Sequence, residues 1–165
     1  MPVINGKTLM AKSPIVGMQP LKIREHGVSH GLGEAGYDIR LKQEVRFKPG
    51  GPGGDFVTVG NGEPEWGRFA IASAIELFDM PNDLVGIVHD KSSWARQGLS
   101  VFNTVIEPGF KGGLTLELVF HGNKELIIPA GAGIAQVIFT SLTHDACYEG
   151  KYQNQSTDPT PSIFG

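Results

Sequence analysis

The strongest constraint on the fold is a set of short apolar runs separated by turn residues. In the clearest run, residues 37–47, every second side chain is apolar and only Gln43 interrupts the apolar face. A period of two is typical of a β-strand that buries one face. The 23 glycines and 11 prolines supply turns between such runs. Together these patterns predict an all-β protein.

Other runs predict further strands and the loops between them. Strands are expected at 56–59, 68–78, 84–88, 99–102, 114–120, 125–128 and 132–139. Residues 1–35 are expected to be irregular with one short strand, and their histidines, His26 and His30, to face water. The glycine-rich stretch 48–55 is expected to be a loop. It is not followed by Gly-Lys-Ser/Thr, so it does not predict a phosphate loop.

Length and charge limit the class of protein. A chain of 165 residues with 40% hydrophobic residues predicts one globular domain, residues 1–165. The net charge of −3 gives no basic field for nucleic acid. No apolar run reaches ~18 residues and no secretory signal is visible, so we expect no membrane span and a cytoplasmic location. The single cysteine, Cys147, allows no intramolecular disulfide.

A possible anion site follows the run 84–88. Two hydroxyls, Ser92 and Ser93, one of which is a plausible helix N-cap, lie between the cations Lys91 and Arg96. Helix N-termini and guanidinium groups both bind phosphate oxygens. The alternative is a capped surface turn with solvated cations, and the segment alone does not decide between them.

Two acidic residues and the C-terminal segment each have two interpretations. Asp38 begins a strand, where it is either a solvated or turn-forming acid or a ligand contact. Glu117 lies on the polar face of 114–120, where it is either exposed or a partly buried carboxylate with a raised pKa that moves protons. Residues 151–165 are either a frayed terminus or a tail that folds over a ligand.

Seven stretches in this order resemble the superfamily of dCTP deaminases and dUTPases, with the greater similarity to the deaminases. They cover the chain from about Gly36 to Gln155. The stretches are Gly36-Tyr37-Asp38-Ile39-Arg40-Leu41, Pro81-Asn82-Asp83-Leu84-Val85-Gly86, Lys91-Ser92-Ser93-Trp94-Ala95-Arg96-Gln97-Gly98-Leu99, Ile106-Glu107-Pro108-Gly109-Phe110, Leu114-Thr115-Leu116-Glu117-Leu118, Gly133-Ile134-Ala135-Gln136-Val137 and Lys151-Tyr152-Gln153-Asn154-Gln155.

The resemblance implies a dUTPase-like subunit, a distorted β-barrel or jelly-roll-like fold of the β-clip kind, that assembles as a homotrimer. It implies active sites between subunits, each closed by the tail 151–165. It implies hydrolysis of dCTP to dUTP and ammonia without zinc, with Mg²⁺ carried by the nucleotide phosphates. The residues agree on zinc, since zinc deaminases need a Pro-Cys-x-x-Cys pair and this chain has one cysteine.

The resemblance also implies roles for individual residues. Glu117 matches the glutamate that activates water, and Ser92 and Arg96 match a serine and an arginine near it. Arg96 is expected to pair with Glu117 and favour its ionised form. The expected nucleotide-binding residues are Lys91, Ser93, Glu107, Thr115, Gln136, Lys151, Tyr152, Gln155 and Asp38, with Glu107 at the deoxyribose 3′-hydroxyl and the three tail residues at the triphosphate.

Two departures leave other functions open. The link from Arg96 to Glu107 is shorter than in the best-known deaminases, which affects the choice between cytosine and uracil. The glycine-rich last motif of the triphosphatases is absent. The alternatives are a dUTP pyrophosphatase or bifunctional enzyme forming dUMP, and a non-catalytic nucleotide-binding protein. Inhibition by dTTP occurs in the family but has no separate signal here.

Overall fold

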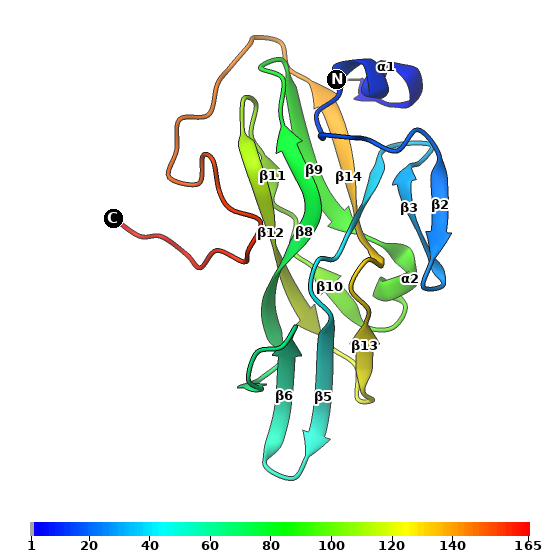
Figure 1. Ribbon diagram of the computed structural model, residues 1–165, viewed down its shortest axis with the longest axis vertical. Coiled ribbons are helices and arrows are strands. Elements are labelled where there is room, and N and C mark those ends of the chain that lie inside the picture. Colours follow the sequence, from blue (N-terminus) through cyan, green and yellow to red (C-terminus); the bar gives the residue numbers. More distant parts are fainter. Residues whose placement is uncertain (1) are drawn as a thin grey trace.

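The computed structural model describes residues 2–165 as β-strands with two short helices (Figure 1). The helices are α1 (Gly6–Lys12) and α2 (Ser92–Ala95). The strands are β1 (Val3–Ile4), β2 (Lys22–Glu25), β3 (Val28–Leu32), β4 (Tyr37–Arg40), β5 (Val45–Gly51), β6 (Gly54–Val59), β7 (Glu65–Trp66), β8 (Phe69–Asp79), β9 (Leu84–Asp90), β10 (Leu99–Val101), β11 (Val105–Ile106), β12 (Lys111–Phe120), β13 (Leu126–Ile128) and β14 (Gly133–Ser141). The predicted all-β class is confirmed.

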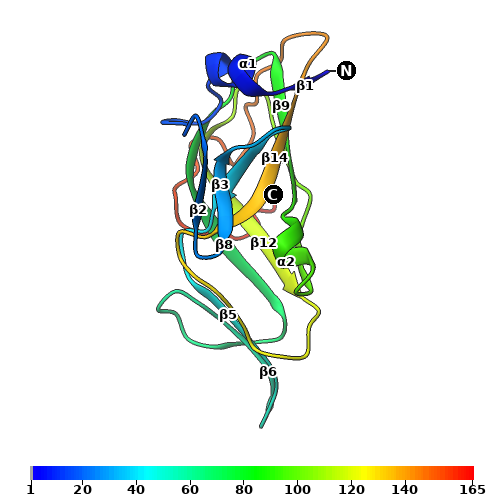
Figure 2. The ribbon, with the colours of Figure 1, turned by 90° about the vertical axis from the view of Figure 1, so that its right-hand side faces the viewer.

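The strands form three sheets around a shared core. The largest has the order β11-β9-β14-β4-β3-β2, and β1 also pairs with β14. A second has the order β10-β12-β8, and a third, β13-β5-β6-β7, extends away from the first two (Figures 1 and 2). The core joins buried side chains of the first two sheets, among them Val88, Val137, Leu116 and Leu118. Burial of these apolar side chains stabilises the packing of the two sheets.

The alternating run 37–47 is two strands, β4 and β5, and not the single strand expected. The chain leaves one sheet for another between them. Leu41 stays in the core and bridges to Ala74 of β8. Gln43 bonds Ser73, because its Nε2 donates to Ser73 Oγ at 2.8 Å and its Oε1 accepts from Ser73 N at 2.9 Å. The one polar residue in the apolar face therefore marks the strand break.

The glycine-rich stretch 48–55 is also not the loop expected. β5 runs on to Gly51, β6 starts at Gly54, and these two residues pair across the hairpin. Gly53 has φ +100°, which favours glycine over any L-residue. The glycines thus make a tight turn at the end of a long hairpin.

The first 35 residues hold more structure than their sequence indicates. α1, β2 and β3 form there, and β2 pairs with β3 as an antiparallel hairpin. His26 at its turn is exposed, as predicted. The prediction for His30 is wrong, because this side chain is buried and its Nε2 lies 3.2 Å from Glu25 Oε2. No helix within residues 2–165 has the length and apolar character needed to cross a membrane.

Candidate active site

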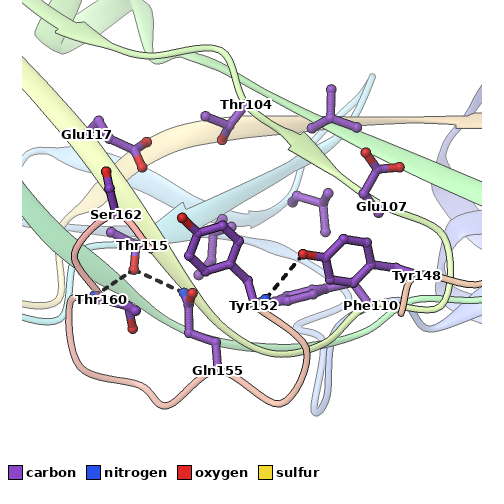
Figure 3. A pocket seen from close by; sticks show the side chains of 13 residues that line it. Thr104, Glu107, Phe110, Thr115, Glu117, Tyr148, Tyr152, Gln155, Thr160 and Ser162 are labelled. Atoms are coloured by element: carbon purple, nitrogen blue, oxygen red, sulfur yellow. Dashed lines mark hydrogen bonds between the residues drawn. The ribbon is translucent and has the colours of Figure 1, made fainter. Parts of the chain in front are cut away.

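A cavity of about 330 Å³ opens beside β12. Its walls come from three parts of the chain: residues 104–110 before β12, the middle of β12, and the C-terminal segment 148–162 (Figure 3). Of the residues predicted for the site, Glu117, Glu107, Thr115, Tyr152 and Gln155 all line this cavity. The structure thus brings five predicted side chains to one cavity, although Glu107 and Gln155 are 48 positions apart in the sequence.

Glu117 lies on the cavity side of β12. Its neighbours Leu116 and Leu118 point into the core and are almost fully buried, so the strand's period of two turns the carboxylate to the opposite face. The side chain is half-buried, and this burial raises the pKa of Glu117 above its ordinary value, while a hydrogen bond from its own backbone amide opposes the shift. A carboxylate with a raised pKa accepts a proton more readily than an ordinary glutamate does, which suits a group that moves protons.

Thr115 and Gln155 connect β12 with the C-terminal segment. Gln155 Nε2 donates to Thr115 Oγ1 at 3.0 Å, and the amide of Thr160 donates to the same oxygen at 3.0 Å. Gly113 N donates to the Gln155 carbonyl at 2.9 Å. A Cβ at Gly113 would lie 2.2 Å from the Ser156 carbonyl oxygen, so only glycine allows this approach. The segment therefore docks on β12, and the interpretation as a frayed terminus is wrong for these residues.

Tyr152 and Lys151 contact the last residues of the chain. Tyr152 Oη accepts a hydrogen bond from the amide of Ile163 at 3.1 Å, and Tyr148 Oη accepts one from the amide of Tyr152 at 3.2 Å. Lys151 is exposed, donates its Nζ to the Ile163 carbonyl, and lies 5.7 Å from the centres of the Tyr152 and Phe164 rings. The cation and the phenol predicted for nucleotide binding thus lie together in this segment, and the phenol lines the cavity.

Glu107 is exposed at the other end of the cavity (Figure 3). It begins the predicted turn, in which its carbonyl accepts a hydrogen bond from Phe110 N at 3.1 Å and Gly109 has φ +72°. The turn carries the carboxylate to the rim, where it is available to a ligand.

Ser92, Ser93 and Arg96 do not line this cavity. All three are exposed, the serines on α2 and Arg96 at its C-cap. This single helical turn is fixed to the largest sheet by Trp94, whose Nε1 donates to the Gly133 carbonyl at 2.7 Å. Arg96 forms no ion pair with Glu117 within residues 2–165, so the predicted pairing does not occur inside one chain. Neither serine is the N-cap, since Lys91 occupies that position.

Lys91 and Asp38 form an ion pair with almost no exposure. Lys91 Nζ lies 2.6 Å from Asp38 Oδ2 and 3.0 Å from Ser29 Oγ, and Ser29 Oγ donates to Asp38 Oδ2 at 3.1 Å. The interpretation of Asp38 as a solvated acid is therefore wrong. The Lys91 ammonium group donates to Asp38 and Ser29, and its side chain is only 10% exposed, which disfavours the predicted phosphate contact. Gln136 lies opposite Asp38 in the β14–β4 ladder, outside the cavity.

Four hydroxyl-bearing residues of the cavity wall were not anticipated from the sequence: Thr104, Tyr148, Thr160 and Ser162. Thr104 lies in a short link without a periodic pattern. The other three belong to a polar C-terminal stretch, in which no local signal distinguishes a residue facing a cavity from one facing water. Their position depends on the return of the chain to β12.

Known proteins resemble this chain in sequence and in fold. A family model described as dCTP deaminase-like matches residues 63–142. The dCTP deaminase of Campylobacter hominis is 36% identical, covering 83% of this chain and 81% of its own. The dCTP deaminase of Campylobacter concisus is 33% identical over 96% and 94% of the two chains, and that of Helicobacter pylori 32% over 87% and 86%.

Solved dUTPases share the fold. The EIAV dUTPase has a TM-score of 0.51 at 17% identity, covering 79% of this chain and 90% of its own. A mutant dUTPase of the S. aureus phage phi11, described with a structural Mg(II) ion, has a TM-score of 0.52 at 14% identity over 79% and 89%. At such identities the likeness concerns the fold, and it confirms the dUTPase-like architecture. The deaminase relatives, each more than 30% identical over most of both chains, show that this chain belongs to the dCTP deaminase family.

Proposed function

We propose that this chain is the subunit of a dCTP deaminase, which hydrolyses dCTP to dUTP and ammonia with Glu117 as the group that activates water. The observation that carries the proposal is the half-buried Glu117 with its raised pKa, in the wall of a cavity, in a member of this family. A general base acts best when its pKa is near the working pH, and burial moves Glu117 in that direction.

The proposed chemistry needs one group that both accepts and returns protons. Ionised Glu117 takes a proton from water as the water oxygen bonds to C4 of cytosine, and passes that proton to N3. It then moves the remaining hydroxyl proton to the amine, so that ammonia leaves and C4 becomes a carbonyl. No other carboxylate among residues 2–165 lines the cavity except Glu107, which is exposed at the rim. Glu107 is proposed to meet the deoxyribose 3′-hydroxyl.

The active site is proposed to be completed by a neighbouring subunit of a homotrimer. Ser92 and Arg96 are exposed and do not reach Glu117 in their own chain, so a second copy would have to supply them. Exposed apolar side chains support such a contact, since the rings of Phe69 and Phe102 stack with centroids 6.2 Å apart and are each 48% exposed. Phe69 pairs with Val119, two residues from Glu117, so this apolar surface adjoins the proposed site.

The triphosphate is proposed to bind the C-terminal segment through Lys151, Tyr152 and Gln155. Ser93 would contribute from the turn formed by residues 91–96, the α2 corner. The segment already lies against β12, and Lys151 is exposed beside Tyr152, which lines the cavity. Thr115 serves in this proposal as the anchor for Gln155. Gln136 and the Lys91–Asp38 pair would support the corner and not contact phosphate, because Lys91 and Asp38 are almost fully buried.

Mg²⁺ bound through the phosphates remains part of the proposal. This ion keeps most of its water and needs few protein ligands beside a triphosphate. Among residues 2–165, no three His, Cys, Asp or Glu side chains are placed to hold a metal. Inhibition by dTTP and the cytoplasmic location also remain predictions.

A bifunctional enzyme that forms dUMP is the second candidate. The exposed carboxylate of Glu107 in the cavity rim favours it, because such a group could position a water near the α-phosphate. A nucleotide-binding protein without catalysis is the third candidate, and turnover alone separates it from the first two.

Incubation of the purified protein with dCTP and Mg²⁺, with ammonia, dUTP and pyrophosphate measured, tests these functions. Ammonia and dUTP in equal amounts are expected. Pyrophosphate with dUMP would establish the bifunctional enzyme, and nucleotide binding without any product would establish the third candidate.

A further inference from the structure

Thr104 is held in a fixed position relative to Glu117 by main-chain hydrogen bonds. Two residues before it, Phe102 N donates to the carbonyl of Glu117 itself at 3.0 Å. The carbonyl of Thr104 accepts a hydrogen bond from Val88 N at 3.0 Å, and the next residue, Val105, pairs with Ile87 in the β11–β9 ladder. Thr104 thus bridges the two sheets at the cavity, and its Oγ1 and the Glu117 carboxylate line the same space (Figure 3).

The hydroxyl of Thr104 differs from most others in the cavity wall. Thr115 Oγ1 accepts from Gln155 and Thr160. The hydroxyls of Tyr148 and Tyr152 accept from main-chain amides, and that of Thr160 donates to the Asp158 carbonyl. Thr104 Oγ1 has no hydrogen-bond partner within residues 2–165, although the side chain is partly buried. Ser162 is the other such hydroxyl, but it lies on the C-terminal segment.

The Glu117 carboxylate likewise has no side-chain partner in the described chain. Both groups face one cavity without a side-chain partner in the described chain, so a single polar molecule in that cavity can bind to both. A water molecule fits both, because it donates one proton to each acceptor and keeps a lone pair free. We propose that Thr104 Oγ1 and Glu117 hold the attacking water between them, which makes Thr104 a residue that positions the nucleophile.

This inference rests on the proposed deamination and adds Thr104 as the second group that binds the attacking water. As the water oxygen bonds to C4, the proton donated to Glu117 transfers to that carboxylate, while the proton directed at Thr104 stays on the oxygen. That second proton leaves later through Glu117 to the departing amine. Thr104 keeps its own proton throughout, so it orients the water and carries no charge.

The experiment compares Thr104→Val, Thr104→Ser and wild type. Valine has the shape of threonine and suits a β-rich link, so folding should be preserved, and the unfolding midpoint of each variant checks this. Loss of one hydrogen bond to the water predicts a fall of about tenfold in kcat for Thr104→Val, with KM and the Kd for dCTP within twofold of wild type. Thr104→Ser should recover most of the kcat.

Thr58→Val provides a matched control, since Thr58 is a partly buried threonine of β6 outside this cavity. Its kinetics should equal those of wild type. A Thr104→Val enzyme with wild-type kcat, or one with unchanged kcat and raised KM, would overturn the inference and leave the proposed function standing. Absence of ammonia from wild type would instead overturn the proposed function and this inference together.

Discussion

Lys91 Nζ contacts Asp38 Oδ2 at 2.6 Å, and the two side chains are only 10% and 7% exposed. This pair ties the start of α2 to β4, so the α2 corner is rigidly attached to the largest sheet. Two residues predicted to bind nucleotide therefore have a structural role, and the exposed residues of α2 that follow them are free to meet another molecule.

Removal of one member of this pair should cost far more stability than removal of both. Asp38→Leu leaves a buried ammonium without its carboxylate, and we expect a loss of about 3 kcal/mol in the free energy of unfolding. Asp38→Leu combined with Lys91→Met should recover much of that loss. Urea unfolding of the two single variants and the double variant measures the coupling, and strictly additive losses would contradict a buried ion pair.

Glu117→Gln should abolish ammonia release and leave dCTP binding intact. The pH dependence follows from the raised pKa of Glu117. The base must be ionised, so kcat/KM of wild type should fall as the pH drops through a value above 4.5, the ordinary pKa of this group. A profile with its acidic limb at or below that value, or turnover by Glu117→Gln, would remove Glu117 from this role.

The same shift predicts a stability effect of Glu117→Gln. The pKa is higher in the folded than in the unfolded chain, so the folded state favours the protonated form. Stability from this group is fully present below the unfolded pKa and is lost as the pH rises through the folded pKa. Glu117→Gln should therefore raise the unfolding midpoint at pH 8 relative to wild type and leave it nearly unchanged at pH 4. An equal change at both pH values would contradict the raised pKa.

Arg96→Ala and Glu117→Gln should complement each other if the active site is shared between subunits. Each variant alone should be nearly inactive. In mixed trimers made by joint refolding at equal amounts, random assembly gives about a quarter of the interfaces an intact Glu117 and an intact Arg96. Ammonia release at about that fraction of wild type is expected. Activity no greater than the sum of the separate variants would show that the two residues do not serve a shared site.

Gly113→Ala should weaken dCTP binding by displacing the C-terminal segment. Its Cβ would lie 2.2 Å from the Ser156 carbonyl oxygen, and main-chain atoms would have to move. We expect a rise of several-fold in KM and an unchanged fold by circular dichroism. Gly51→Ala is the control, because the nearest atom to its Cβ is 3.6 Å away, in the distant hairpin. Equal KM values for Gly113→Ala and Gly51→Ala would argue against a role of the docked segment in binding.

Local sequence patterns were sufficient to predict which face of a strand a side chain occupies, because this depends only on the period of two. The alternation across 114–120 correctly predicted that Glu117 faces away from Leu116 and Leu118, and the order of motifs correctly predicted the family. The same reasoning failed at residues 37–47, because a period of two does not reveal where a strand changes sheets. There Gln43 turns toward Ser73, a partner 30 residues away.

The sequence by itself determined which residues alternate, where turns fall and which chemical groups are present, since these depend on neighbours a few positions apart. The tertiary structure decided which of those groups remain free for chemistry. Asp38 and Lys91 lie 53 positions apart and neutralise each other, while Thr115 and Gln155 lie 40 apart and close one cavity. Such pairings arise only when sheets pack, because burial and partner choice depend on the whole folded chain.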